Sequence, residues 1–177
     1  EFSNFFDVDY ALMLNSGSSA NLLAIASMIL DDDVDLNPGD EVIVPAVSWS
    51  TTFSPVSQYG LKLNFVDINL DTLNIDENLI ENAINEKTKA IIPVHLYGQM
   101  CEMDKIMELA NKYNLKVIED CAQSHGATYK GKKAGSIGHV GCFSFYPTKI
   151  FGAYGDGGFI TTNDEQIHDK IKRIRFL

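Results

Sequence analysis

A lysine follows an apolar segment that is interrupted by a proline. Residues 141–149 read Gly-Cys-Phe-Ser-Phe-Tyr-Pro-Thr-Lys, so a strand pattern breaks at Pro147 and Lys149 comes two residues later. A lysine that leaves a buried strand beside an apolar or cationic site can lose its proton and act as a nucleophilic amine. The alternative for a single lysine is a solvated surface charge. The glycine-rich run at 152–158 precedes a strand pattern, so it does not fit a dinucleotide-binding fingerprint.

Two adjacent carboxylates end another apolar segment, Val117-Ile118-Glu119-Asp120. Side chains alternate along a strand, so only one of the two can point into a shared site. Asp120 at the end of a central strand could hold the ring nitrogen of a pyridoxal cofactor in its protonated form. The alternative is a helix cap or an ion pair in a loop. Gln123 and His125 follow on the same loop.

Two further segments have residue types that suit a ligand. Residues 15–21 read Asn-Ser-Gly-Ser-Ser-Ala-Asn just before a helical pattern, where small residues, free amides and hydroxyls could bind a phosphate. A serine N-cap without ligand is the alternative, and no Gly-Lys-Ser/Thr follows to make a Walker loop. Trp49 lies between a strand pattern and a helical pattern. It could stack on a planar ring or fill the core.

Alternating strand and helix patterns must position these residues. Apolar runs rich in β-branched residues occur at 41–45, 63–68, 90–94, 116–119, 141–145 and 158–162. Helical patterns lie between them at 19–30, 51–59, 75–85, 102–113 and 164–174. This order predicts an α/β fold with three layers, in which helices cover both faces of a mainly parallel sheet. Residues 126–138 are less regular and indicate a surface loop or hairpin. In such sheets ligands collect where strands end and helices begin.

The composition narrows the classes of function. Fourteen basic against 24 acidic residues give a net charge of −10, which opposes nonspecific binding to nucleic acid or to an anionic membrane. No apolar run approaches the roughly 20 residues of a membrane span. Three cysteines without C-x-x-C spacing indicate neither a disulfide framework nor a zinc site, and they fit a reducing cytoplasm. No serine or cysteine lies in a nucleophile elbow, which disfavours a hydrolase.

Taken together, these segments resemble the sugar aminotransferases named after DegT, DnrJ, EryC1 and StrS. The resemblance covers essentially the whole chain and is most specific in Ser144-Phe-Tyr-Pro-Thr-Lys149, followed by Gly152-Ala-Tyr-Gly-Asp-Gly-Gly158. Two other matching segments are Glu119-Asp-Cys-Ala-Gln123-Ser-His-Gly-Ala and Pro93-Val-His-Leu-Tyr-Gly-Gln99. The family is similar in fold to aspartate aminotransferase, so the resemblance implies the large domain of a fold type I pyridoxal-phosphate (PLP) enzyme over residues 1–177.

The resemblance also implies a role for each matching residue. Lys149 would carry the cofactor as a Schiff base and shuttle the proton between substrate carbon and cofactor. Asp120 would pair with the pyridine nitrogen, and Gln123 with the phenolic oxygen. Trp49 matches the residue that stacks on the ring. The phosphate would be held by Ser18, Ser19 and Ser144.

The implied reaction moves an amino group from L-glutamate to a keto sugar linked to a nucleotide, for amino-sugar or surface-polysaccharide biosynthesis in the cytoplasm. A similar branch of the family removes a sugar hydroxyl instead, and it has histidine where this chain has Lys149. A PLP-dependent sugar-nucleotide 3-dehydratase is therefore the second hypothesis. The resemblance leaves open which nucleotide sugar reacts and whether its 3- or 4-keto position is aminated.

The length of the chain raises a third hypothesis. Members of the family are about twice as long, form homodimers and take active-site residues from the partner subunit. The chain starts without methionine and stops inside a helical pattern, so we expect a fragment that lacks a smaller carboxyl-terminal domain. A non-catalytic ligand-binding fragment is accordingly the alternative from another class of function.

Overall fold

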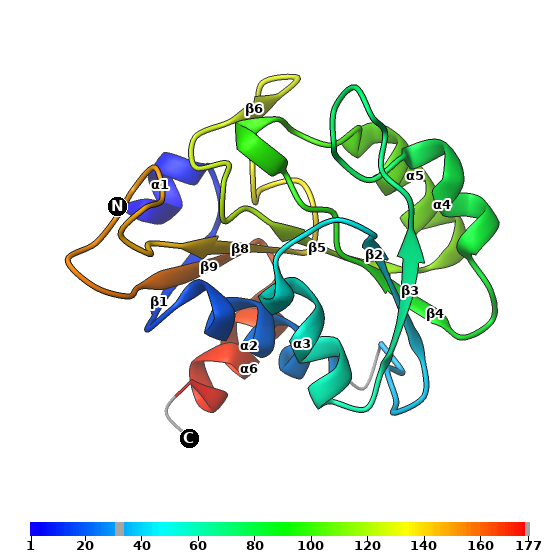
Figure 1. Ribbon diagram of the computed structural model, residues 1–177. Coiled ribbons are helices and arrows are strands. Elements are labelled where there is room, and N and C mark those ends of the chain that lie inside the picture. Colours follow the sequence, from blue (N-terminus) through cyan, green and yellow to red (C-terminus); the bar gives the residue numbers. More distant parts are fainter. Residues whose placement is uncertain (31–33, 176–177) are drawn as a thin grey trace.

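The structure, a computed structural model, describes residues 1–30 and 34–175. A seven-stranded sheet lies between helices, so the chain folds into three layers (Figure 1). From edge to edge the strands are ordered β1-β9-β8-β5-β4-β2-β3. Their bounds are Tyr10–Leu14 (β1), Glu41–Pro45 (β2), Lys62–Val66 (β3), Thr88–Ile91 (β4), Lys116–Asp120 (β5), Val140–Ser144 (β8) and Gly158–Thr162 (β9).

The five strands from β3 to β8 run parallel to one another. Only the other edge is antiparallel, where β9 pairs with β8 and β1 pairs with β9. The mainly parallel sheet expected from the sequence is therefore confirmed. A short separate hairpin, β6 (Thr128–Tyr129) and β7 (Lys132–Lys133), occupies the irregular segment.

Helices cover both faces of the sheet (Figure 1). On one face lie α2, α3 and α6, and on the other lie α4 and α5, whereas α1 packs its Phe6 against the aromatic rings of β8 and β9. The bounds of the helices are Phe2–Phe6 (α1), Gly17–Ile29 (α2), Ser50–Gln58 (α3), Glu77–Ala83 (α4), Met103–Tyr113 (α5) and Glu165–Ile174 (α6). Within the described ranges no helix combines the length and the apolar character needed to cross a bilayer.

The continuous apolar runs of the strands follow from this layering. In β2, Val42 and Val44 pack into the core beneath α2 and α3, while Ile43 packs into the core beneath α4 and α5. A strand that is buried on both faces needs apolar residues at successive positions instead of alternate ones. This pattern made the central strands recognisable in the sequence.

The predicted strands and helices are confirmed, with ends shifted by at most three residues. The strand predicted at 90–94 is β4, Thr88–Ile91, and it stops two residues before Pro93, which has no N–H for a ladder. Three described elements were missed, namely α1, β1 and the 3-10 turn η1 (Leu96–Gly98). The segment of β1 is short and its partner β9 lies about 150 residues further along the chain, so its strand character depends on tertiary pairing.

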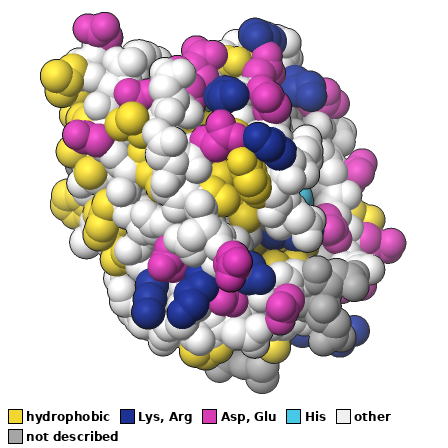
Figure 2. Space-filling model, turned by 90° about the vertical axis from the view of Figure 1, so that its right-hand side faces the viewer, with side chains coloured by type: hydrophobic (Ala, Val, Ile, Leu, Met, Phe, Trp, Pro, Cys, Tyr) yellow, Lys and Arg dark blue, Asp and Glu magenta, His cyan; other side chains and the backbone are white. Residues whose placement is uncertain are grey.

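Figure 2 shows the face of the molecule that includes α4 and β3, where acidic and basic side chains are interspersed. An ion pair joins α4 to α5, in which Lys112 Nζ and Glu81 Oε1 are 2.7 Å apart. This face of the described chain has no continuous basic band of the kind that attracts a phosphate backbone.

Candidate active site

A cavity of about 610 Å³ opens where β5 and β8 end and where α2 and α3 begin. This is the edge of a parallel sheet at which ligands usually bind. The residues that line it include most of those singled out in the sequence. They are Ser16, Gly17, Ser18, Asn21, Ser48, Trp49, Thr51, Thr52, Val94, Asp120, Ala122, Gln123, Cys142, Phe143, Ser144, Tyr146, Thr148, Lys149 and Asp156.

The start of α2 forms one wall of the cavity. Ser16 is its N-cap, and the Ser16 hydroxyl accepts a hydrogen bond from the Ser19 amide at 3.1 Å. Gly17 lies so close to the end of β8 that a Cβ there would be 2.5 Å from Ser144 Cβ. Glycine therefore lets the positive end of the helix and the Ser144 hydroxyl approach each other, as a phosphate cradle requires.

Asp120 lies on the floor of the cavity and is held by three hydrogen bonds. Its Oδ2 accepts from Thr52 Oγ1 at 2.8 Å and from Asn21 Nδ2 at 3.1 Å, and its Oδ1 accepts from the amide of Ala122 at 3.1 Å. The residue is only 5% exposed. The carboxylate thus has a fixed orientation. The neighbouring Asn21 Oδ1 is buried without a hydrogen-bond partner among the described residues, which leaves one acceptor in the cavity wall.

Lys149 is half-buried in a turn just after β8, in which its backbone amide donates to the Tyr146 carbonyl at 2.8 Å. Gln123 is also half-buried, and its Oε1 accepts the Tyr97 amide at 2.9 Å. Trp49 is 74% exposed on the rim, so it does not fill the core. The flat face of its ring remains available to a ligand.

The structure brings six of the seven sequence-derived site residues to one cavity, from segments up to 131 positions apart. Ser19 does not line it. Its hydroxyl accepts a hydrogen bond from Ser16 Oγ at 3.1 Å, and the residue lines a second hollow between β1, α2 and the end of α6.

Two residues that hold Asp120 were missed in the sequence. Asn21 lies three residues after Ser18, and Thr52 lies three residues after Trp49, so each is at helical spacing from a residue already chosen. Helical spacing from those residues was the signal that could have found them.

His125 lies in a cage of aromatic rings, close enough to Lys149 to be affected by its charge. Its ring is 5.8 Å from that of Phe145, 5.4 Å from Phe143 and 5.7 Å from Phe151, centroid to centroid. Burial lowers the pKa of His125 to about 4, and the positive charge of Lys149 acts in the same direction, whereas Ser144 opposes the shift. The imidazole is therefore neutral at physiological pH, with no charge to repel the lysine.

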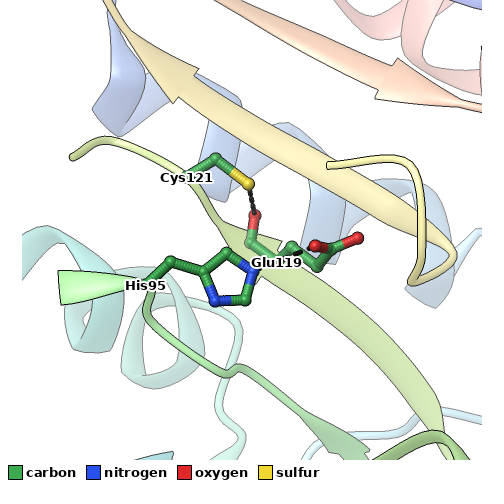
Figure 3. Close-up of side chains that lie close together, drawn as sticks. All are labelled: His95, Glu119 and Cys121. Atoms are coloured by element: carbon green, nitrogen blue, oxygen red, sulfur yellow. Dashed lines mark hydrogen bonds and ion pairs between the residues drawn. The ribbon is translucent and has the colours of Figure 1, made fainter. Parts of the chain in front are cut away.

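A buried cluster on the other side of β5 contains His95, Glu119 and Cys121 (Figure 3). Their residue types could bind a metal, but His95 Nε2 already contacts Glu119 Oε2 at 2.9 Å. The Cys121 thiol donates to the Glu119 carbonyl at 3.6 Å. Burial, with the nearby carboxylates, raises the pKa of Cys121 well above its usual value, and a protonated thiol is a poor metal ligand.

Curated proteins are similar in sequence to this chain over nearly its whole length. GDP-perosamine synthase from Caulobacter vibrioides is 43% identical over 174 residues, which cover 98% of this chain and 45% of that protein. UDP-2-acetamido-2-deoxy-3-oxo-D-glucuronate aminotransferase from Pseudomonas aeruginosa is 44% identical over 172 residues, covering 97% of this chain and 46% of that protein. The chain thus spans less than half the length of these relatives.

A solved structure has the same fold over the same extent. GDP-4-keto-6-deoxymannose-3-dehydratase, with a trapped PLP-glutamate geminal diamine, superposes with a TM-score of 0.92 at 43% identity, over 97% of this chain and 44% of that one. The model of the DegT/DnrJ/EryC1/StrS aminotransferase family matches residues 1–177. The chain therefore belongs to the DegT/DnrJ/EryC1/StrS aminotransferase family.

Proposed function

We propose that residues 1–177 form the PLP-binding large domain of an enzyme that transfers an amino group from L-glutamate to a nucleotide-linked keto sugar. One observation carries this proposal. Lys149 and Asp120, from the ends of β8 and β5, line the same cavity as the serine-containing start of α2. An amine, a carboxylate and an anion-binding helix start are the groups that PLP requires of a protein.

The residues in the cavity fit PLP chemically. Gly17 leaves the space in which Ser18, Ser144 and the amides of α2 would hold the phosphate. Asp120 would face the ring nitrogen, with its orientation fixed by the hydrogen bonds from Thr52 and Asn21.

The remaining lining residues would orient the ring and handle the proton. Trp49 would cover one face of the ring, and Gln123 would donate to the phenolic oxygen through its side-chain nitrogen. Lys149 Nζ would hold the cofactor covalently and later carry a proton to or from the substrate carbon. The bound cofactor supplies an electron sink for the bond that breaks at that carbon.

The substrate class rests on the relatives. One is a GDP-perosamine synthase, another is an aminotransferase of a UDP-linked 3-oxo sugar, and the superposed dehydratase was trapped with PLP and glutamate. Glutamate as donor and a nucleotide-linked keto sugar as acceptor are consistent with these names. Such a substrate is consistent with amino-sugar or surface-polysaccharide biosynthesis in the cytoplasm.

A homodimer would complete the site. Trp49, which is 74% exposed, and Tyr146 line the cavity, and further large apolar side chains are exposed in the segments that follow the lining residues Val94 and Lys149. These are Tyr97 at 78%, Phe151 and Tyr154. Large apolar side chains that are exposed beside a binding site favour coverage by another protein surface. We propose that a second copy of the chain covers it.

The second candidate function is a PLP-dependent 3-dehydratase, which the superposed structure favours. Lys149 distinguishes the two. A primary amine can hold the cofactor covalently and recover it after each half-reaction, whereas a histidine in its place cannot. The lysine therefore supports amino transfer.

The test begins with the cofactor. The protein incubated with PLP should show an absorbance band near the boundary between the ultraviolet and the visible range. Borohydride should then reduce the imine and leave the cofactor attached to Lys149 as a label, which peptide mass spectrometry locates. Lys149→Ala should lose the label, whereas Lys132→Ala, a substitution of an exposed lysine on β7, should keep it. A label on another lysine, or none, would refute the proposed site.

Turnover then separates the hypotheses. With L-glutamate and a 4-keto-6-deoxy nucleotide sugar, a new sugar amine supports transfer. Loss of a hydroxyl without nitrogen gain supports the dehydratase. PLP binding without either product supports a non-catalytic ligand-binding fragment.

A further inference from the structure

The fully buried Glu119 carboxylate collects four N–H donors from two separate segments. Oε2 contacts His95 Nε2 at 2.9 Å and accepts the Gly135 amide at 3.0 Å. Oε1 accepts the amides of Ile137 at 2.8 Å and Gly138 at 2.6 Å. Burial by itself raises the pKa of Glu119, but His95 and the amides outweigh it and lower the pKa. Glu119 is therefore a charged group that joins residues 135–138 to His95. Figure 3 shows its carboxylate beside the His95 ring.

His95 extends this connection into the next loop. Its Nδ1 accepts the Cys101 amide at 3.2 Å, so the ring proton belongs on Nε2, where it is donated to Glu119. The backbone between these two residues includes the 3-10 turn η1, Leu96–Gly98. Within that turn, the Tyr97 amide donates to Gln123 Oε1 at 2.9 Å. The orientation of the Gln123 side chain therefore depends on the loop that His95 closes.

The same cluster also adjoins Asp120. The His95 amide donates to the Asp120 carbonyl at 3.1 Å, and the Asp120 amide donates to the Pro93 carbonyl at 2.9 Å. Glu119 precedes Asp120 on β5 and projects to the opposite side of the strand, away from the cavity. The end of β5 is thus fixed from both sides.

A buried carboxylate is costly, and an apolar residue of similar volume often stabilises a fold as well or better. What the charge provides here is a set of strong, directional bonds to backbone amides in a loop. We infer that Glu119 and His95 are positioning residues for the cofactor, which hold Asp120 and Gln123 in the orientation that PLP requires. This inference rests on the proposed PLP site.

Glu119→Gln tests it with almost no change in volume. A glutamine side chain replaces one of the two carboxylate oxygens with an NH₂ group. That NH₂ group must then face N–H donors, which are either those of His95 and Gly135 or those of Ile137 and Gly138. We expect the dissociation constant of PLP to rise about tenfold, which corresponds to about 1.4 kcal/mol. The pH titration of the bound cofactor's absorbance should also shift, because the ring nitrogen loses its aligned partner.

Thr161→Val is the matched control. The fully buried Thr161 hydroxyl donates to the Gly135 carbonyl at 2.6 Å, so valine loosens the same loop without touching Glu119 or β5. It should lower the melting temperature but leave PLP affinity and the absorbance titration unchanged. If Thr161→Val and Glu119→Gln weaken PLP binding equally, loop stability alone explains the effect and the inference is wrong.

A second pair of variants decides the matter if Glu119→Gln does not fold. His95→Gln retains a donor at the position of Nε2, whereas His95→Asn places its polar group only at the position of Nδ1. PLP should bind His95→Gln several-fold more tightly than His95→Asn. Equal affinities would contradict the positioning role. Wild-type protein that fails to bind PLP at Lys149 would instead overturn the proposed function itself.

Discussion

The side-chain amide of Asn21 donates to Asp120 Oδ2 at 3.1 Å although the two residues are 99 positions apart in the chain. This contact joins the first turns of α2 to the end of β5 across the floor of the cavity. It couples the wall proposed to bind phosphate to the group proposed to bind the ring nitrogen. The predictions below follow from this arrangement.

The Thr52 hydroxyl should matter more for the cofactor than for the fold. Thr52→Val removes the 2.8 Å hydrogen bond to Asp120 Oδ2, a loss of about 1–2 kcal/mol, because the buried acceptor keeps fewer partners. We expect a small fall in melting temperature and a several-fold weaker binding of PLP by absorbance titration. Thr162→Val removes a buried hydroxyl far from the cavity and should affect only the melting temperature. Unchanged PLP affinity in Thr52→Val would contradict the role assigned to Asp120.

Asp120→Asn should separate binding from chemistry. The amide keeps the size of the carboxylate but cannot stabilise a positive charge on the ring nitrogen. We expect PLP still to bind, while the rate of amino transfer falls by orders of magnitude in single-turnover measurements with L-glutamate. Wild-type turnover in this variant would exclude a pyridinium partner at position 120.

Gly17→Ala should weaken binding of the phosphate selectively. The new Cβ would lie 2.5 Å from Ser144 Cβ, so the start of α2 must move away from β8. Competition between PLP and pyridoxal, which lacks the phosphate, gives the measurement. We expect the affinity for PLP to fall about tenfold or more while that for pyridoxal changes little. An equal loss for both ligands would show that the change disturbs the whole cavity.

His125 should make the folded state sensitive to acid. Its pKa is lowered from 6.5 to about 4 in the folded chain, so below pH 6.5 the unfolded state binds a proton that the folded state does not. The free energy of unfolding therefore falls as the pH decreases from about 6.5 to about 4, and it is unaffected by this group above that range.

His125→Phe should remove part of that slope in urea denaturation measured across the same pH range, because a phenyl ring fits the aromatic cage and does not titrate. His168→Gln, at a histidine on α6 outside the cage, is the control for the replacement of a histidine elsewhere in the chain. Identical slopes for His125→Phe and the wild type would show that His125 is not the group responsible.

The sequence was sufficient to predict that Lys149 and Asp120 lie at the same site. Lys149 follows an apolar run and Asp120 ends another, and strand ends meet at one edge of a parallel sheet. Side-chain alternation also predicted that only one carboxylate of β5 would face the cavity, and Asp120 is the one that does. The hydrogen bonds from Asn21 and Thr52 to Asp120 could not be predicted from the sequence pattern. They depend on how α2 and α3 pack over β5, which involves long-range contacts with no local pattern.

The role of Glu119 was equally hidden. Its four donors lie 16 to 24 positions away, and three of them are backbone amides of an irregular segment that has no sequence signature. The β1 strand was missed for a related reason, since its only sheet partner is the distant β9.

The anchoring of residues 135–138 by Glu119 has a practical consequence for labelling this molecule. The β6–β7 hairpin is held at its base, whereas its tip at Lys130 and Gly131 lies exposed in solvent. The anchor lies between this tip and β5. A fluorophore or an affinity tag inserted between these two residues should therefore report on the protein without disturbing the cavity.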